Sequence, residues 1–486
     1  MDLVALRKAV ALPKQWIAVL AAYAAVVAAT VPRHEPWFDE AQSWLLGRDL
    51  TLPKLIGWIR YEGTPPLWQI ILWGANRLHL PYAALGWISG AIAVAGMFVF
   101  LRFAPFPWPV KLLLPFSYFF LYQYAVVARS YVLLPLLAFS AAALYKDAAR
   151  RPFLFFAVLF LLANVSAHGT LLSAGIAAAF VVETLGRWSS LDAAARRRHG
   201  EAVGLYGLAM LGIVWMVWPA VDCTFPVMPQ GWDGAAGAMA GGLVDNLTLS
   251  ALVLIVAVAW CLYRRAVGGL LIPLVLLLVF FEKVYVNVWH YGAITICLIT
   301  GLWIAWSAGD SVDGDSVAGK RRRDAVADGI MAVVLALVLG VQIPWSVKTI
   351  RYDWAAPYSG ARNAAMYLKA VGADEQRVFA FGFSSVAILP YFDHQIFENQ
   401  RMPGGTTFWQ WRRDNRIDMG VNLVGAERPD YIVFSVKEPH TVAPSISQAA
   451  QETFGRMGYV LVHVSPGALY WKDRTWETDS YLIFAR

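Results

Sequence analysis

The sequence is poor in charged residues and in cysteine. Only 15% of its 486 residues are Asp, Glu, Lys or Arg, whereas soluble globular proteins carry about 25%. Hydrophobic residues make up 58% of the chain, which excludes an ordinary soluble domain and indicates a polytopic membrane protein. The three cysteines, Cys223, Cys261 and Cys297, show no CxxC spacing, so neither a disulfide framework nor a zinc site is indicated.

Signatures of nucleotide and nucleic-acid binding are missing as well. The polar tail from residue 348 onward contains no Gly-rich phosphate loop, no Walker signature and no internal repeat. The net charge of +7 comes largely from basic runs in short loops between apolar segments, namely Arg150-Arg151, Arg196–Arg198, Arg264-Arg265 and Lys320–Arg323. Because such runs are typical of cytoplasmic loops, they report membrane topology and argue against nucleic acid as a partner.

Long apolar blocks dominate the first two thirds of the chain. A membrane-spanning helix needs roughly 20 mostly apolar residues. The sequence predicts about eleven spans, at 16–31, 82–103, 112–127, 131–145, 153–167, 169–186, 202–220, 247–263, 268–282, 291–307 and 327–346. The first block could instead be a cleaved signal peptide, but the next apolar block follows with no soluble domain between them, which favours a retained helix. The short block 65–78 is better interpreted as an interfacial helix.

With this count every basic run falls on one side of the membrane. We therefore expect a polytopic α-helical membrane protein of about eleven transmembrane helices, with a C-terminal soluble α/β domain. The transmembrane part covers residues 1–347 and includes a first outer loop at 33–80; the α/β domain covers 348–486. The expected location is the cytoplasmic (inner) membrane, with the N-terminus in the cytoplasm and the C-terminal domain on the extracytoplasmic side.

The tail alternates apolar stretches of strand length with helical patterns. Strands are predicted at "RVFAFGF", "QIFENQ", "DYIVFSV", "YVLVHV" and "SYLIFAR". Helices are predicted at "ARNAAMYLKAV" and at "TFWQWRRDNRIDMGVNLVG", residues 407–425. Alternating strands and helices indicate a compact α/β domain.

Ionisable residues gather at the turns that this topology places outside. The most conspicuous turn carries "WFDE", in which Asp39 and Glu40 follow two aromatic residues. A carboxylate whose pKa is raised by a like charge and by partial burial could remove the proton of an acceptor hydroxyl. Alternatively, the two residues open a helix, where acidic side chains are worth about 0.3–1 kcal/mol.

Three stretches carry a family resemblance. The segments "EPWFDEAQSWLLGRDL", "YEGTPPLWQIIL" and "QYAVVARSYVLLPLLAFSAAALY" resemble the GT-C class of integral-membrane glycosyltransferases. Within that class they are most similar to the protein O-mannosyltransferase-like branch (glycosyltransferase family 39) and the lipid A aminoarabinose transferases. The resemblance covers roughly residues 1–310, and Thr64 stands where the class usually has a histidine.

The resemblance implies a concrete activity. Such enzymes transfer a monosaccharide, usually with inversion, from a polyprenyl-phosphate carrier to a hydroxyl of a glycan, lipid or protein acceptor on the outer side of the membrane. It implies that Asp39 is the base or orients the acceptor, with Glu40 as its catalytic neighbour. Arg129 and Tyr131 match a second outer turn that often holds site residues, and His290 matches a basic position near the lipid phosphate.

Further candidates for binding the donor phosphate or substrate are the remaining ionisable or polar residues of the outer turns. These are Arg60, Tyr61, His168 and Lys283. Because Ser130 and Tyr131 occupy a position where relatives often carry an acid, a mechanism without metal is favoured and no metal ligand is assigned. The adjacent carboxylates Asp39 and Glu40 leave a divalent metal open, and no other cofactor is expected.

Two other classes of function remain open. A transporter or flippase of lipid-linked sugars would carry charges or broken helices near the middle of its spans, often in two related halves. A scaffold that binds a partner through its outer domain would not require Asp39. The sequence identifies neither the sugar nor the acceptor, and it does not decide the oligomeric state.

Overall fold

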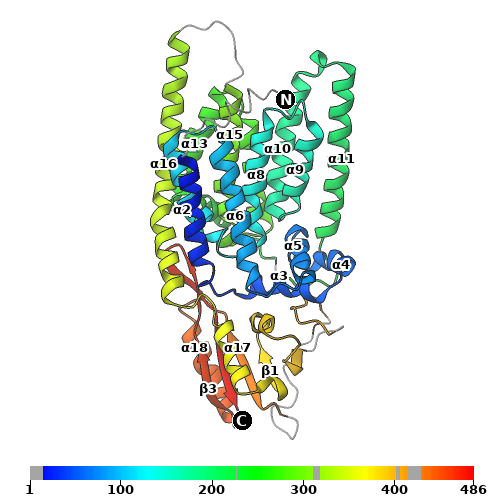
Figure 1. The fold of residues 1–486 in the computed structure, drawn as a ribbon, viewed down its shortest axis with the longest axis vertical. Helices are drawn as coiled ribbons and strands as arrows, with labels where there is room; N and C mark the ends of the chain where they lie inside the picture. The colour runs from blue at the N-terminus through cyan, green and yellow to red at the C-terminus, as the bar shows by residue number, and fades with distance from the viewer. Residues whose placement is uncertain (1–14, 226, 310–317, 401–404, 414, 416–427) are drawn as a thin grey trace.

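The computed structural model describes residues 15–225, 227–309, 318–400, 405–413, 415 and 428–486. A helical bundle forms one part of the molecule, and a smaller sheet domain from the C-terminal third lies against one end of it (Figure 1). We call this the sheet end of the bundle and the opposite one the far end. The side chains of the basic run at 320–322 lie outside the described residues.

Within the described residues the bundle is built mainly from ten apolar helices of 12 to 38 residues. They are α2 (Gln15–Thr30), α6 (Ala84–Phe103), α8 (Leu133–Tyr145), α9 (Pro152–Ala163), α10 (Ala167–Gly186), α11 (Ala193–Val217), α13 (Leu247–Tyr263), α14 (Gly268–Lys283), α15 (Gly292–Gly309) and α16 (Ala318–Ala355). Among the described residues, five helical segments are long and apolar enough to cross a membrane, or up to six if α12 (Gly231–Leu243) and α13, bent by 76°, form one span. The higher count of about eleven spans stays a prediction.

The outer surface of the bundle exposes large apolar side chains, and their exposure to water is unfavourable. On α11, Leu208, Leu211 and Trp215 are each about 70% exposed, at 68%, 69% and 73%. By contrast, the apolar segment that contains α15 is 94% buried at the centre of the bundle. Extended apolar surfaces of this kind mark contact with lipid or protein, and the helices that carry them are consistent with a membrane protein.

The span expected at 112–127 is not a continuous helix. It is divided into α7 (Trp108–Leu113), the 3₁₀ turn η1 (Leu114–Phe116) and the π-helical turn η2 (Phe119–Gln123). Pro115 explains the break, because it lacks an amide hydrogen and its ring clashes with the preceding helical turn. Irregular backbone follows η2 and delivers Arg129 to the sheet end of the bundle.

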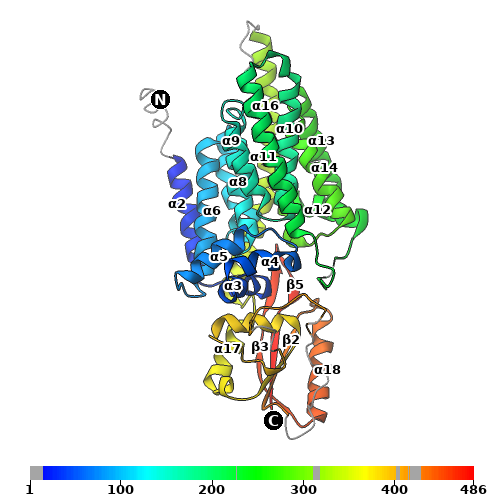
Figure 2. The ribbon, with the colours of Figure 1, turned by 90° about the vertical axis from the view of Figure 1, so that its right-hand side faces the viewer.

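The first loop, 33–80, folds into three short helices that lie across the sheet end. These are α3 (Phe38–Asp49), α4 (Leu52–Glu62) and α5 (Leu67–Arg77), and Figure 2 shows them between the bundle and the sheet domain. Gly63 ends α4 in a left-handed conformation, with φ of 62°, so that the chain turns into Pro65-Pro66 before α5. The interfacial helix predicted at 65–78 corresponds to α5.

The sheet domain contains four strands in the order β1-β2-β6-β3. The strands are β1 (Val378–Phe381), β2 (Tyr431–Val436), β3 (Val460–Ser465) and β6 (Ser480–Ala485); β1 and β2 are parallel and the other neighbours antiparallel. Helices α17 (Ala361–Ala370) and α18 (Ala443–Arg456) complete the domain. Four predicted strands and the helix at 361–371 are confirmed, whereas α18 was not expected.

Two sequence predictions in the domain are wrong. "QIFENQ" forms no strand: Phe397 makes one isolated bridge to Val378, and the 3₁₀ turn η8 (Glu398–Gln400) follows at once. The helix expected at 407–425 is absent from 407–413, where the chain is extended or turning; residues 416–427 lie outside the described residues. The helical periodicity gave a wrong prediction here because hydrogen bonds from α3 hold the backbone of Trp409 in an extended conformation.

A second, two-stranded sheet connects the domain to the bundle. Strands β4 (Ala468–Trp471) and β5 (Arg474–Thr478) form a hairpin whose turn carries Lys472. The Lys472 side chain is fully buried, and its ammonium group donates to the Gly241 carbonyl at 2.9 Å and pairs with Asp245 at 3.0 Å. The backbone of Lys472 is held by Tyr118 and Thr349, so this turn is an integral part of the bundle.

Candidate functional site

The candidate site centres on an ion pair between Asp39 and Arg129. Asp39 lies in the first turn of α3, where the helix dipole favours a negative charge. Arg129 precedes the 3₁₀ turn η3 (Ser130–Val132), and its Nη2 lies 2.7 Å from Asp39 Oδ2. The two side chains are 18% and 27% exposed for Arg129 and Asp39, so the pair is shielded yet accessible. The turns "WFDE" and "ARSY" therefore meet in space.

Aromatic rings and a second cation surround this pair. The Arg129 guanidinium lies over the rings of Trp37 and Tyr131, at 5.6 and 4.9 Å from their centroids. The ammonium group of Lys437, which follows β2, lies over the Trp37 ring at 4.2 Å. Lys437 also pairs with Glu477 at 3.1 Å. Two cations from distant parts of the chain thus share one indole ring, an arrangement able to receive an anion.

Two histidines extend the site toward the bundle interior. The rings of His168 and His290 are 4.6 Å apart, and Tyr131 lies 5.9 and 5.5 Å from them, respectively. His290 accepts from the Asn287 amide through Nδ1. Both ring nitrogens of His168 are buried without a hydrogen-bond partner in the described chain. The structure therefore brings together five of the residues singled out in the sequence, including both histidines.

Glu62 is a residue that sequence reasoning missed. One carboxyl oxygen accepts from Gln42 at 3.1 Å and from the Trp58 indole at 3.2 Å. Burial raises the pKa of the Glu62 carboxyl from 4.5 to about 7; these hydrogen bonds oppose the shift, and the nearby charge of Asp39 adds to it. Gln42 also exchanges two hydrogen bonds, both 2.8 Å long, with the backbone of Trp409. The only sequence signal was its place directly before the "GTPPL" element.

Glu40 is placed differently from its neighbour Asp39. Its side chain is fully buried, and it accepts from the amides of Trp37 and Ala128 at 3.1 and 2.6 Å. It also pairs with His34 at 3.1 Å, and His34 pairs in turn with Asp353 of α16 at 2.9 Å. These contacts occupy both carboxylate oxygens, which favours a positioning role for Glu40 over the catalytic one suggested by the sequence.

The buried network around His34 is strongly charged. Burial by itself lowers the pKa of the His34 imidazole, but the carboxylates of Glu40 and Asp353 outweigh it and raise that pKa from 6.5 to about 10. Asp353 accepts a further hydrogen bond from Tyr122 at 2.8 Å. The charged imidazolium therefore joins the loop before α3 to the last turn of α16, and so fixes the position of the Asp39 turn.

The remaining predicted residues lie outside this cluster. Lys283 pairs with the adjacent Glu282 at 2.7 Å and is 68% exposed. Tyr61 donates to Asp222 at 2.9 Å, and its ring lies tilted at 4.7 Å from that of Trp58, on the side of α4 that faces the α11–α12 loop. Arg60 has a buried Nε without a partner in the described chain. None of these residues is shown in contact with the Asp39–Arg129 pair.

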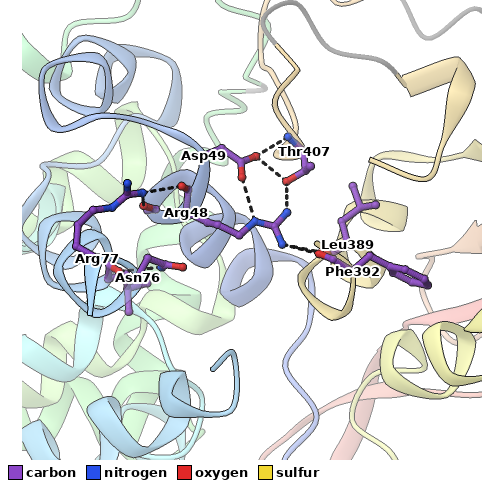
Figure 3. A network of polar contacts seen from close by, with 9 residues as sticks. Arg48, Asp49, Asn76, Arg77, Leu389, Phe392 and Thr407 are labelled. Carbon is purple, nitrogen blue, oxygen red and sulfur yellow. Dashed lines mark hydrogen bonds and ion pairs between the residues drawn. The ribbon is translucent and has the colours of Figure 1, made fainter. Parts of the chain in front are cut away.

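A segment of the sheet domain, residues 405–413, lies along α3; we call it the strap. Figure 3 shows its main anchor: Arg48 donates to the carbonyl of Phe392 at 2.7 Å and to the Thr407 hydroxyl at 2.6 Å. Asp49 accepts from both the amide and the hydroxyl of Thr407, each at 2.6 Å. Charge-assisted bonds therefore fix the strap beside the site.

A metal centre is not evident in the part of the chain that the structure describes. Within those residues no three His, Cys, Asp or Glu side chains gather closely enough to hold an ion. The charged groups around the ion pair include the cations Arg129 and Lys437 and the carboxylates of Asp39, Glu62 and Glu477. Such a set can hold an anionic group and accept a proton beside it.

Comparison with known proteins adds no assignment. No family model, curated protein or solved structure matches this chain.

Proposed function

We propose that this protein is a membrane glycosyltransferase of GT-C type. It moves a monosaccharide from a polyprenyl-phosphate carrier to a hydroxyl group of a glycan, lipid or protein on the outer side of the cytoplasmic membrane. The observation that carries the proposal is the partly exposed Asp39–Arg129 pair, flanked by Lys437 and lying where the bundle, α3 and the sheet domain meet. The sheet end then faces outward, and the N-terminus lies in the cytoplasm.

The arrangement of the helices supports this topology. The amide of Leu67, at the start of α5, donates to the Asn164 carbonyl at the end of α9, so α9 ends at the sheet end. The loops before α9 and before α11, which contain Arg150-Arg151 and lead to Arg196–Arg198, then lie at the far end (Figure 2). Basic loops on one face favour that face as the cytoplasmic one.

The two cations suit the leaving group of such a reaction. As the bond between the anomeric carbon and the phosphate oxygen breaks, negative charge grows on the lipid phosphate. Arg129 can bind two phosphate oxygens at once, and Lys437 can act as a point charge. In a shielded site such preorganised charges contribute several kcal/mol to the transition state. Because side chains supply this charge, the proposed mechanism requires no divalent metal.

The carboxylates of Glu62 and Asp39 have different roles in the remaining steps. The acceptor oxygen attacks the anomeric carbon from the face opposite the phosphate, and its proton passes to a carboxylate. Glu62 suits this step, since a base with a pKa of about 7 is half ionised at neutral pH and still basic enough to take the proton. Asp39, paired with Arg129, orients the cation and the acceptor hydroxyl. Inversion at the anomeric carbon follows from this single displacement.

The test is release of polyprenyl phosphate from a panel of polyprenyl-phospho-sugars, with a membrane extract as the source of acceptor. We expect Asp39→Asn and Arg129→Gln each to lower turnover by about 10²–10³-fold, as loss of one charge-stabilising group does. Glu201→Gln, an exposed carboxylate on α11 at the far end, is the matched control and should leave turnover unchanged. EDTA should have no effect.

Other outcomes point to other functions. Movement of the intact lipid-linked sugar across proteoliposomes, without release of polyprenyl phosphate, would identify a flippase. Full turnover by both Asp39→Asn and Arg129→Gln would remove this pair from the mechanism. Sensitivity to EDTA, restored by a divalent ion, would contradict the metal-free mechanism.

A further inference from the structure

A cavity of about 200 Å³ lies at the far end of the bundle, across the helices from Asp39. It is formed where α8, α10 and α15 end and α11 begins, and its polar lining includes Tyr145, Lys146, Glu183, Arg187 and His199. Pockets for drug-sized ligands measure roughly 300–1,000 Å³. This cavity therefore suits a compact polar group, such as the headgroup of a lipid.

His199 provides an unused hydrogen-bonding atom in the wall. The residue is only 3% exposed, and its Nδ1 donates to the Ala195 carbonyl at 2.7 Å. Because Nδ1 is engaged in this bond, Nε2 is the nitrogen left over, and it is buried without a partner in the described chain. The Phe180 ring stacks nearly parallel to the imidazole, at 6.0 Å and 13°, and fixes its plane. A buried polar nitrogen without a partner favours a ligand that brings a hydroxyl, which can both donate and accept.

The charges around the cavity suit an anion that also carries hydroxyl groups. Lys146 and Arg187 are exposed and contribute two positive charges, and neither forms a close ion pair among the described residues. Glu183 lies beside Tyr145 in the wall and offers a carboxylate to hydroxyl donors. Cations suit a phosphate, whereas a carboxylate and an imidazole nitrogen suit the hydroxyls of a polyol.

The surface next to the cavity is apolar. Val182 and Leu185, which flank Glu183 and Thr184 on α10, are 62% and 59% exposed. Acyl chains attached to a bound headgroup would cover these side chains, which otherwise remain unpartnered. We propose that the cavity binds a phosphoglycerol group, as borne by an anionic membrane lipid, with the phosphate between Lys146 and Arg187 and the glycerol hydroxyls donating to Glu183 and His199.

The first test measures lipid binding to the full-length protein in nanodiscs of neutral phosphatidylcholine. Dioctanoyl phosphatidylglycerol is titrated, and retained lipid is counted by native mass spectrometry. We expect one saturable site, weakened at least tenfold by the double substitution Lys146→Gln and Arg187→Gln. The matched control removes the same charge at the same end, Arg150→Gln with Arg151→Gln, and should bind like wild type. Equal weakening by both double variants, or no saturable binding, would overturn the proposal.

The second test asks about hydroxyl recognition and about the source of the ligand. His199→Phe keeps a ring against Phe180 but removes Nε2, so it should lower the preference for phosphatidylglycerol over phosphatidic acid several-fold. An unchanged preference would remove His199 from the site. A parallel titration with sn-glycerol 3-phosphate distinguishes the sources: binding as tight as that of the lipid would identify a soluble phosphoglycerol, and much weaker binding the lipid. Neither readout depends on transferase activity.

Discussion

Two sets of charged residues, one at each end of the helical bundle, contribute to the fold in opposite ways. At the sheet end, His34, Glu40 and Asp353 are all less than a tenth exposed and bind one another across distant segments. At the far end, Arg197 pairs with Glu201 one turn along the same helix, at 3.7 Å, and the two side chains are 77% and 51% exposed. The first arrangement holds distant segments of the chain together. The second joins neighbouring turns of one helix and so does not constrain the tertiary fold.

The contrast shows why charged residues at the two ends do not say equally much about the folded structure. Exposed pairs in water contribute about 0–1 kcal/mol, so basic residues at the far end can serve topology without shaping the structure. Buried charges are tolerated only when each has a partner, so their positions are specified by several segments at once. The buried charges at the sheet end are therefore the better guide to how distant segments are arranged.

The largest expected effect concerns the buried network. His34→Ala would leave the carboxylates of Glu40 and Asp353 without their shared cation, and breaking a buried pair costs roughly 3–5 kcal/mol. Because the folded-state pKa of His34 is raised from 6.5 to about 10, its stabilisation is fully present below pH 6.5 and is lost as the pH rises toward 10. Thermal unfolding in detergent at several pH values measures this. His394→Ala, exposed on the sheet domain, is the control, and an equal effect of both would contradict the contrast.

A smaller effect is expected at Glu62, seen in activity rather than stability. Wild-type turnover should fall below pH 7 as the carboxylate is protonated, and Glu62→Gln should lower turnover at pH 8 by about 10²-fold and abolish this pH dependence.

The raised pKa of Glu62 also means that folding disfavours the charged form, so the free energy of unfolding falls as the pH rises from 4.5 to 7. Glu62→Gln should then be at least as stable as wild type at pH 8. Glu375→Gln, exposed in the sheet domain, should change neither property; a pH profile retained in Glu62→Gln would exclude Glu62 as the base.

The anchor of the strap should show an intermediate change. Arg48→Lys keeps the charge but loses the planar fork that binds the Phe392 carbonyl and the Thr407 hydroxyl. Hydrogen bonds to charged groups contribute about 1.5–3 kcal/mol. Hydrogen exchange at the amides of Thr407 and Trp409 should therefore accelerate, while Arg351→Lys, at an exposed position of α16, leaves it unchanged. Unchanged exchange in both variants would mean that the strap is held by other contacts.

The smallest effect is expected at the far end. Arg197→Gln breaks the exposed pair with Glu201 and should change the free energy of unfolding by less than about 0.5 kcal/mol. Thermal unfolding beside His34→Ala compares the two ends directly. A loss of several kcal/mol in Arg197→Gln would show that the far end is also built on its ion pairs.

Much of the secondary structure could be predicted because local patterns determine it. Apolar blocks of the right length became helices, and short β-branched stretches such as "DYIVFSV" became strands. The break at Pro115 was visible in the sequence, yet its consequence was not, because proline can also kink a helix without ending it. The extended strap around Trp409 escaped prediction, since long-range contacts with Gln42 override its helical periodicity.

The site could be predicted only in part. Placing Asp39, Arg129, His168 and His290 at turns on one face was enough to expect them near one another, and the structure brings them together. Asp39 and Glu40, however, are adjacent in sequence and point to different partners, because consecutive helical residues face different directions. Lys437 and the raised pKa of Glu62 depend on tertiary contacts, for which one sequence carries no signal.

The hairpin turn at Lys472 has a consequence for biosynthesis. Its side chain binds the Gly241 carbonyl, 231 residues earlier in the chain, in the interior of the bundle. A ribosome delivers the helices before this turn, so the Gly241 carbonyl of α12 lacks its lysine partner until the turn has been made. Assembly of the bundle is therefore completed only after the sheet domain has emerged and folded back. A chain that stops before residue 468 would present quality-control proteases with a bundle that lacks its final contact.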